Sequence, residues 1–240
     1  LAAAGEHHPF WIRVRAPDHI PAGIYRGTVT VQADGIRVTT VLNAEVYDFT
    51  LPDTMTCETA FGFNAHAAWR YHKATEPVQR RAVLDRYLRC LGDYRLSPYD
   101  PAPMDRWSVT WRNFDARTGK PDAGKTVADI EPVFRWDEWD AAMTRAVESN
   151  RFNTFRIRIE GLGGGTFHAR TEPSLLGFAG GTPEYELLMG KYLRGIESHL
   201  REKGWLDKAF VYWFDEPDPK DYEFVVEGME MIKRNAPGLK

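Results

Sequence analysis

Two adjacent acids follow a run of apolar and aromatic residues in the segment FVYWFDEPDP, positions 210–219. The run predicts a buried strand that ends at Asp215 and Glu216. Two neighbouring carboxylates in a semi-buried pocket cannot both ionise freely, so one is expected to hold a proton while the other stays negative. Cleavage of a glycosidic bond needs this pairing: a proton for the leaving oxygen and a negative charge near the oxocarbenium-like carbon.

A structural role is the alternative for these acids, because carboxylates are also favoured at the N-terminus of a helix. The residues that follow already provide such a cap. Asp218 and Pro219 fit the N-cap and the first helical position, and Asp221 fits the third. We therefore expect Asp215 and Glu216 to lie between strand end and helix start, where they are free to act as catalytic residues.

The elements that would position the acids alternate between strands and amphipathic helices from Thr54 onward. Four apolar stripes have the i, i+3, i+4 spacing of a helix that buries one face. Their residues are Leu84, Tyr87, Leu88 and Leu91; Trp139, Ala142, Met143 and Ala146; Tyr185, Leu188, Met189, Tyr192 and Ile196; and Tyr222, Val225, Val226 and Met229. This order predicts an α/β fold with a parallel sheet, either a (β/α)8 barrel or an open doubly wound sheet.

The segment FRIRIE, positions 155–160, favours the barrel. Its apolar side chains share one face, and Arg156, Arg158 and Glu160 share the other. A strand covered by helices on both sides would be apolar on both faces, so the polar face is expected to line a barrel interior. An edge strand of an open sheet is the alternative.

The first 53 residues have a different pattern. Alternating strands are predicted at 25–32 and 36–47, around a turn at Ala33-Asp34-Gly35, and this is typical of antiparallel sheet. We place a domain boundary after Asp53. Because the rest of the chain holds only about four βα units, we expect residues 54–240 to be the first half of a barrel.

Two glycine-rich motifs invite other interpretations. The segment GKPDAGKT, positions 119–126, satisfies the P-loop pattern, but it lacks the buried strand before it and the helix after it that a phosphate site needs. We interpret it as a surface hairpin. The segment GLGGGTFHAR, positions 161–170, is too irregular to lead straight into a helix, and we interpret it as a mobile loop with glycine hinges.

Composition limits the partners. The formal net charge of −3 over 240 residues gives no reason to expect nucleic acid, and no apolar run is long enough for a membrane span. His66 and His72 lack supporting carboxylates, so no metal is expected, and no cofactor motif other than the P-loop match is found. Cys57 and Cys90 are too few for a disulfide framework and are expected to be buried free thiols. The N-terminal residues do not form a signal peptide.

The run HLREKGWLDKAFVYWFDEPDPKDYEFV, together with the β segment before Thr54, resembles glycoside hydrolase family 123 and related glycoside hydrolase-like domains of unknown function. The resemblance implies a β-sandwich, whose last strands are residues 1–53, followed by a (β/α)8 barrel, secretion or a periplasmic location in a bacterium, and retaining hydrolysis of β-N-acetylgalactosaminides. It implies that Asp215 orients the 2-acetamido group of the substrate and stabilises the oxazolinium intermediate. Glu216 would act as general acid and then as general base.

Other candidate contacts with the sugar rest on position alone. Asn64, Arg158, Glu160 and Trp213 follow predicted strands, and barrel enzymes place their substrates at that end of the sheet. Two other functions stay open. One is a conventional retaining glycosidase with Glu216 as acid/base and its nucleophile on a later strand; the other is a carbohydrate-binding module without catalysis.

Overall fold

The computed structural model describes residues 5–17, 19–33 and 35–240, and the chain divides into two compact units, Leu1–Asp53 and Thr54–Lys240. The division falls where the sequence changes from strand alternation to alternating strands and helices. The larger domains to which the two units belong, a sandwich and a barrel, stay predictions.

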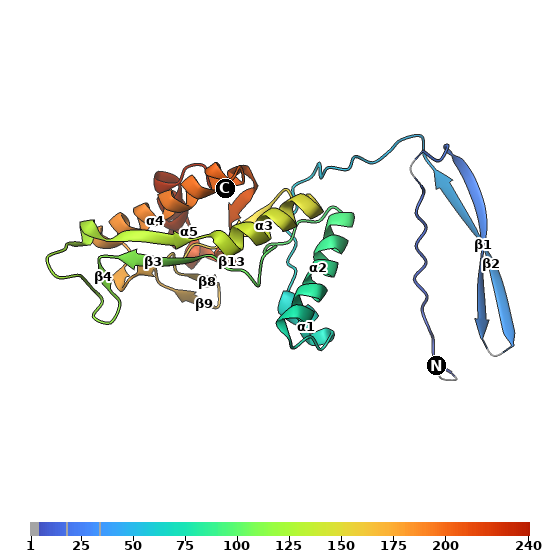
Figure 1. Ribbon diagram of the computed structural model, residues 1–240, viewed down its shortest axis with the longest axis horizontal. Coiled ribbons are helices and arrows are strands. Elements are labelled where there is room, and N and C mark those ends of the chain that lie inside the picture. The colour runs from blue at the N-terminus through green and yellow to red at the C-terminus, as the bar shows by residue number, and fades with distance from the viewer. Residues whose placement is uncertain (1–4, 18, 34) are drawn as a thin grey trace. The chain divides into compact units, whose positions relative to one another are not determined.

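The first unit contains one antiparallel hairpin (Figure 1). Strand β1 (Gly23–Ala33) pairs with β2 (Ile36–Val46) along its whole length, and Ala33 lies opposite Ile36. Both strands occur where the sequence predicts them, within two residues at each end. The predicted turn contains Asp34, which lies outside the described residues, and Gly35 has a positive φ of 83°.

Five α-helices lie in the second unit. They are α1 (Ala65–Tyr71), α2 (Pro77–Asp93), α3 (Asp137–Asn150), α4 (Pro183–Glu202) and α5 (Tyr222–Asn235). The predicted stripes of α3 and α4 are buried, as are the three leucines of the α2 stripe. In the described part of the chain, no helix is long and apolar enough to cross a membrane.

Helix α5 departs from its predicted packing. Tyr222, Val226 and Met229 are 55%, 54% and 41% exposed, whereas Met231 and Ile232 are buried. The prediction of a buried stripe is wrong here because α4 meets only the last turns of α5. At that contact the Asn235 Oδ1 atom accepts a hydrogen bond from Arg194 at 3.0 Å.

The strands of this unit are short. They are β3 (Ser108–Arg112), β4 (Phe114–Asp115), β5 (Lys120–Pro121), β6 (Glu131–Arg135), β7 (Phe155–Ile157), β8 (Gly164–Thr166), β9 (Ala169–Thr171), β10 (Ser174–Leu175), β11 (Phe178–Ala179), β12 (Ala209–Val211) and β13 (Phe214–Asp215). Strand β12 pairs in parallel with β7, and β13 pairs in parallel with β8. Single-turn 3-10 helices are η1 (Val127–Asp129), η2 (Leu206–Lys208) and η3 (Pro219–Asp221).

Backbone hydrogen bonds extend the parallel pairing beyond these strands. Phe61 forms a parallel bridge with Pro98, and its carbonyl accepts from the Tyr99 amide at 2.9 Å. The Tyr99 carbonyl accepts in turn from the Arg156 amide of β7 at 2.8 Å. Four parallel segments, centred on 61, 98, 156 and 210, therefore lie side by side in chain order. The fold is mixed α/β, and the described residues form no closed barrel.

The core of the second unit lies on one face of these segments. Phe155 and Ile157 of β7 are 1% and 2% exposed and belong to one cluster with buried residues of α3 and α4. Arg158 and Glu160, on the other face, are exposed. The alternation predicted for FRIRIE is therefore present, and the polar face points away from the helices.

The P-loop match lies in an antiparallel ribbon, as the sequence predicts. Strands β3 and β6 pair along five residues beside α4, and β4 and β5 continue the ribbon towards its tip (Figure 1). Lys125 is exposed and is followed by a 3-10 turn, not by an α-helix. Lys191 of α4 fixes the base of the ribbon, since its Nζ atom donates to the carbonyls of Ala128 and Ile130 at 2.7 and 2.9 Å.

The interpretation of residues 161–170 as a hinged loop is wrong. The segment folds into the β8–β9 hairpin, and its glycines permit close backbone contact. A Cβ atom on Gly165 would lie 2.1 Å from the Ala169 carbonyl oxygen, and one on Gly164 would lie 2.5 Å from the Trp213 carbonyl oxygen. Glycine is needed at both positions because a side chain would collide with backbone that cannot move aside.

The two cysteines are free, as predicted, but both are exposed. Cys90 lies on α2 outside the stripe that buries Leu84, Leu88 and Leu91, so it points away from the core. Cys57 lies in the irregular segment before α1. The prediction of burial rested on the average behaviour of cysteine and is wrong for both.

Candidate active site

The carboxyl ends of the parallel segments carry most of the predicted site residues. Asp215 ends β13, where it lies opposite Thr166 of β8. Asn64, Arg158 and Glu160 follow the segments centred on 61 and 156. Because parallel strands end at the same edge of a sheet, this face collects side chains that are far apart in the sequence.

Asp215 is exposed and is held by its neighbour Tyr212. The Tyr212 hydroxyl donates a hydrogen bond to Asp215 Oδ1. This hydrogen bond, together with partial desolvation and the negative charge of Asp215, raises the pKa of Tyr212 to about 12. The phenol therefore keeps its proton and stays a hydrogen-bond donor to Asp215.

Glu216 occupies an unusual backbone conformation. Its φ is +48°, in the left-handed region that residues other than glycine adopt only a few per cent of the time. Its side chain is exposed and, among the residues that the structure describes, makes no hydrogen bond or ion pair. Both acids are thus exposed, although the sequence predicts a semi-buried pair, because the edge of β13 is open at this point.

The helix cap predicted from the sequence is present. Asp218 is the N-cap of η3, its Oδ1 atom accepts from the Lys220 amide at 3.1 Å, and Asp221 completes a capping box. Helix α5 continues from Tyr222. Asp215 and Glu216 take no part in this cap, which is made by Asp218 and Asp221.

An aromatic and cationic cluster lies beside the acids and was missed in the sequence. The rings of Phe210 and Tyr212 are 5.9 and 6.0 Å from that of Tyr99, and the Arg156 guanidinium lies over the Tyr99 ring at 5.3 Å. Burial and the nearby charge of Arg158 lower the pKa of Arg156, and its buried Nε has no hydrogen-bond partner among the residues that the structure describes. The signal was present: Phe210 and Tyr212 alternate with buried Ala209 and Val211 and share the face of Arg156.

The four residues predicted to contact the sugar lie in different environments. Asn64 caps α1, where its Oδ1 atom accepts from the Ala67 amide at 3.0 Å. Arg158 and Glu160 are exposed on the polar face. The Trp213 indole packs against α5, with its ring 5.2 Å from that of Phe224, and within the described part of the chain its buried Nε1 has no hydrogen-bond partner. Among the described residues, no hydrogen bond, ion pair or ring contact joins any of the four to Asp215 or Glu216, so their role in binding stays a prediction.

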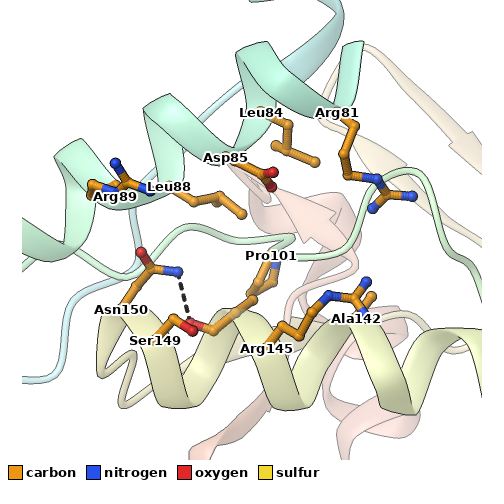
Figure 2. Close-up of a pocket in the computed structure, with 11 residues that line it drawn as sticks. Arg81, Leu84, Asp85, Leu88, Arg89, Pro101, Ala142, Arg145, Ser149 and Asn150 are labelled. Carbon is orange, nitrogen blue, oxygen red and sulfur yellow. Dashed lines mark hydrogen bonds between the residues drawn. The ribbon is translucent and has the colours of Figure 1, made fainter. Parts of the chain in front are cut away.

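Two cavities lie away from the acids. One, of about 500 Å³, separates α2 from α3, and Figure 2 shows Arg81, Asp85 and Arg145 facing it from the two helices. The other, of about 250 Å³, is lined by Thr59, Thr154 and others at the amino ends of the parallel segments. Within the described ranges, no three His, Cys, Asp or Glu side chains are grouped as a metal site would require.

Comparison with known proteins finds a family model that matches part of the chain and a solved structure with a similar fold. Residues 165–240 match the family described as "Glycoside hydrolase 123, catalytic domain". The solved structure of a family 123 glycoside hydrolase from Clostridium perfringens, described in work on glycolipid glycan hydrolysis, has a TM-score of 0.50 and 18% identity to this chain. At that level of identity, the similarity shows only that the two proteins share a fold.

The match to that structure covers 90% of this chain but only 40% of the other, so the chain spans less than half the length of the hydrolase. No curated protein matches the chain. The family match nevertheless includes β13, η3 and α5, and with them both acids. The part of the chain that carries Asp215 and Glu216 is therefore similar to the catalytic domain of glycoside hydrolase family 123, which confirms the resemblance predicted from the sequence.

Proposed function

We propose that the protein is a retaining glycoside hydrolase that acts on β-linked 2-acetamido-2-deoxy sugars, N-acetylgalactosaminides above all, with the acetamido group of the substrate as nucleophile. The observation that carries the proposal is the unequal environment of two adjacent acids. Asp215 accepts a hydrogen bond from Tyr212, whereas Glu216 is exposed and unpaired among the described residues. One acid is fixed in place by a hydrogen-bond donor, and the other is left exposed where a substrate can reach it.

The two acids divide the reaction between them. Glu216 gives its proton to the glycosidic oxygen as the C1–O bond breaks, and the acetamido oxygen forms a bond to C1, which yields an oxazolinium ion. Asp215, oriented by the Tyr212 hydroxyl, accepts a hydrogen bond from the acetamido N–H and offsets the positive charge of the ring that forms. Glu216 then takes a proton from water, whose oxygen attacks C1 and reopens the ring.

Adjacent residues suit this division better than they suit a conventional retaining mechanism. The conventional nucleophile and acid must lie on opposite sides of the sugar, with their carboxyl groups about 5 Å apart. Asp215 and Glu216 are joined by one peptide bond at a single strand exit, so both approach the substrate from the same side. A nucleophile that comes from the substrate removes the need for a second carboxylate opposite.

The pairing of the parallel segments supports a partial (β/α)8 barrel as the scaffold of this site. Each segment lies beside the one that precedes it in the chain, and the Val211 amide of β12 donates to the Lys240 carbonyl at 2.7 Å. A doubly wound sheet would instead reverse its strand order part of the way along. We further propose that the hairpin of the first unit forms the last strands of a β-sandwich.

The test compares substrates and variants in the full-length protein. Aryl 2-acetamido-2-deoxy-β-galactosides should be cleaved, and the matching 2-hydroxy sugars should not. Glu216→Gln should lower the rate by roughly 10²–10⁴ with poor leaving groups and by less with an activated phenol, which departs without a proton. Asp215→Asn should lower it with either leaving group, because the charge that faces the oxazolinium ion is lost.

Glu223→Gln is the matched control, since it removes an exposed acid from the first turn of α5. It should leave the rate unchanged. Equal turnover of 2-hydroxy and 2-acetamido substrates would refute the acetamido mechanism and favour the conventional one. Sugar binding without turnover, unaffected by loss of both acids, would indicate a binding module.

A further inference from the structure

The loop that carries Glu216 is fixed at both of its ends. Before it, Asp215 is paired with Thr166 of the β8–β9 hairpin. After it, Asp218 caps η3, and the Asp221 amide donates to the Asp218 carbonyl at 2.9 Å. Only Glu216 and Pro217 lie between these fixed points. A left-handed residue other than glycine costs of the order of 1–2 kcal/mol and persists only where its surroundings impose it.

The β8–β9 hairpin also holds the far end of this loop. Lys220 of η3 donates from Nζ to the Phe167 carbonyl at the hairpin tip, at 2.7 Å. Arg170 of β9 reaches Asp221 of η3, with 3.5 Å between Nη1 and Oδ1. The hairpin therefore contacts the loop before and after Glu216, so the hairpin position sets the loop conformation.

Arg170 is the central side chain of this contact. Its Nε donates to Glu172 Oε1 at 2.9 Å, and its guanidinium lies 4.7 Å from the centre of the Phe224 ring on α5. The side chain of its partner Asp221 is only 2% exposed. A carboxylate this deeply buried requires a cation or several donors, and besides Arg170 it has one further donor, the Asp218 amide, at the same distance of 3.5 Å.

We propose that Arg170 is a positioning residue for Glu216. It neutralises Asp221, which keeps the cap at Asp218 in place and thereby holds Glu216 in its left-handed conformation. Arg170 itself need not touch the substrate. The inference rests on the proposed role of Glu216 as general acid. Only a misplaced proton donor would make the effect of removing Arg170 on the rate depend on the leaving group.

The experiment measures kcat and KM of the full-length protein with two aryl 2-acetamido-2-deoxy-β-galactosides, one with an activated phenol and one with a poor leaving group. Arg170→Met should lower kcat about tenfold to a hundredfold with the poor leaving group and less than threefold with the activated one. KM should change less than about twofold. Arg170→Lys, which keeps the cation, should recover part of the loss.

Asp221→Asn gives an independent measurement from the other partner. Asparagine keeps an acceptor for the cap but removes the buried charge. It should reproduce the dependence on leaving group, and the double variant with Arg170→Met should lose little more than either single variant. Arg234→Met is the matched control, because Arg234 lies on α5 and pairs with Glu186 at 3.5 Å, away from the loop. It should leave both rates unchanged.

The outcomes separate the two proposals. If Glu216→Gln shows no dependence on the leaving group, the proposed function fails whatever Arg170 does. If Glu216→Gln shows the dependence on the leaving group, but Arg170→Met lowers the rates with both substrates equally or lowers neither rate, the positioning role alone is refuted. Should Arg170→Met not fold, Arg170→Lys and Asp221→Asn decide the matter by the same comparison.

Discussion

The hydrogen bond between Tyr212 and Asp215 predicts how one tyrosine titrates. Tyr212 is 41% exposed, and a tyrosine that exposed ordinarily ionises near pH 10. Here the donated hydrogen bond and the carboxylate charge raise its pKa to about 12. Removing the carboxylate charge in Asp215→Asn should move the pKa part of the way back towards 10, because the amide oxygen is a weaker acceptor than the carboxylate and the smaller contribution of desolvation remains.

The size of the effect makes it measurable at a single pH. At pH 11 a phenol with a pKa of 12 is about one tenth ionised, whereas one with a pKa of 10 is about nine tenths ionised. The chain has 10 tyrosines, so the signal of Tyr212 is isolated by comparison with Tyr212→Phe. The assay is tyrosinate absorbance between pH 9 and 11.5, recorded for the protein, Tyr212→Phe and Asp215→Asn.

The expected result is that the protein and Tyr212→Phe give nearly the same absorbance at pH 11, because Tyr212 contributes almost no tyrosinate. Asp215→Asn should then gain up to one further ionised tyrosine at that pH. A difference of a full tyrosinate between the protein and Tyr212→Phe would show that Tyr212 does not donate to Asp215. The unequal environment of the two acids, which carries the proposed function, would then be lost.

Two further predictions concern stability. In Gly92→Ala the new Cβ would lie 2.8 Å from the Asn150 carbonyl oxygen. Crowding of about 1–3 kcal/mol should exceed the helix-propensity gain of about 1 kcal/mol, so the melting temperature should fall. Gly62→Ala is the control, because its Cβ meets nothing within 4 Å and the melting temperature should not fall. Arg81 donates to both oxygens of Asp105, and this pairing holds the pKa of the Asp105 carboxyl below its usual range, so its contribution to stability is present above about pH 4 and is lost as the pH falls further. Urea unfolding at pH 7 and pH 3 should therefore show a smaller difference between the protein and Asp105→Asn at the lower pH; an unchanged difference would contradict the ion pair.

The sequence predicted the elements best where a single physical signal decided them. The stripes of α3 and α4 are buried because they pack together and against β7 and β12 in one core. The cap at Asp218 formed because it needs only local atoms. The same periodicity predicted a buried stripe on α5 wrongly, since tertiary contacts, and not the helix itself, decide which face of a helix is buried.

The candidate site was predicted in part. Asp215 and Glu216 could be found because a buried strand that runs into two acids is unusual, and the P-loop match could be rejected because its neighbours were wrong. Arg156 and Tyr99 could not be brought together from sequence, because 57 positions separate them and only the pairing of the parallel segments makes them neighbours. The β8–β9 hairpin was missed for a related reason: its glycines indicate close contact as readily as freedom, and the contacting backbone, at Trp213, lies far along the chain.

The chain order of the parallel segments also has a consequence for folding during synthesis. The segments at 61, 98, 156 and 210 each pair with the one made just before, so every new pairing closes a loop of roughly 40 to 60 residues and never requires a segment not yet translated. The contact order is therefore intermediate. Helices α2, α3 and α4 can form locally before the strands beside them have paired. At each stage the newest segment has an unpaired edge, and the next segment to leave the ribosome pairs with that edge.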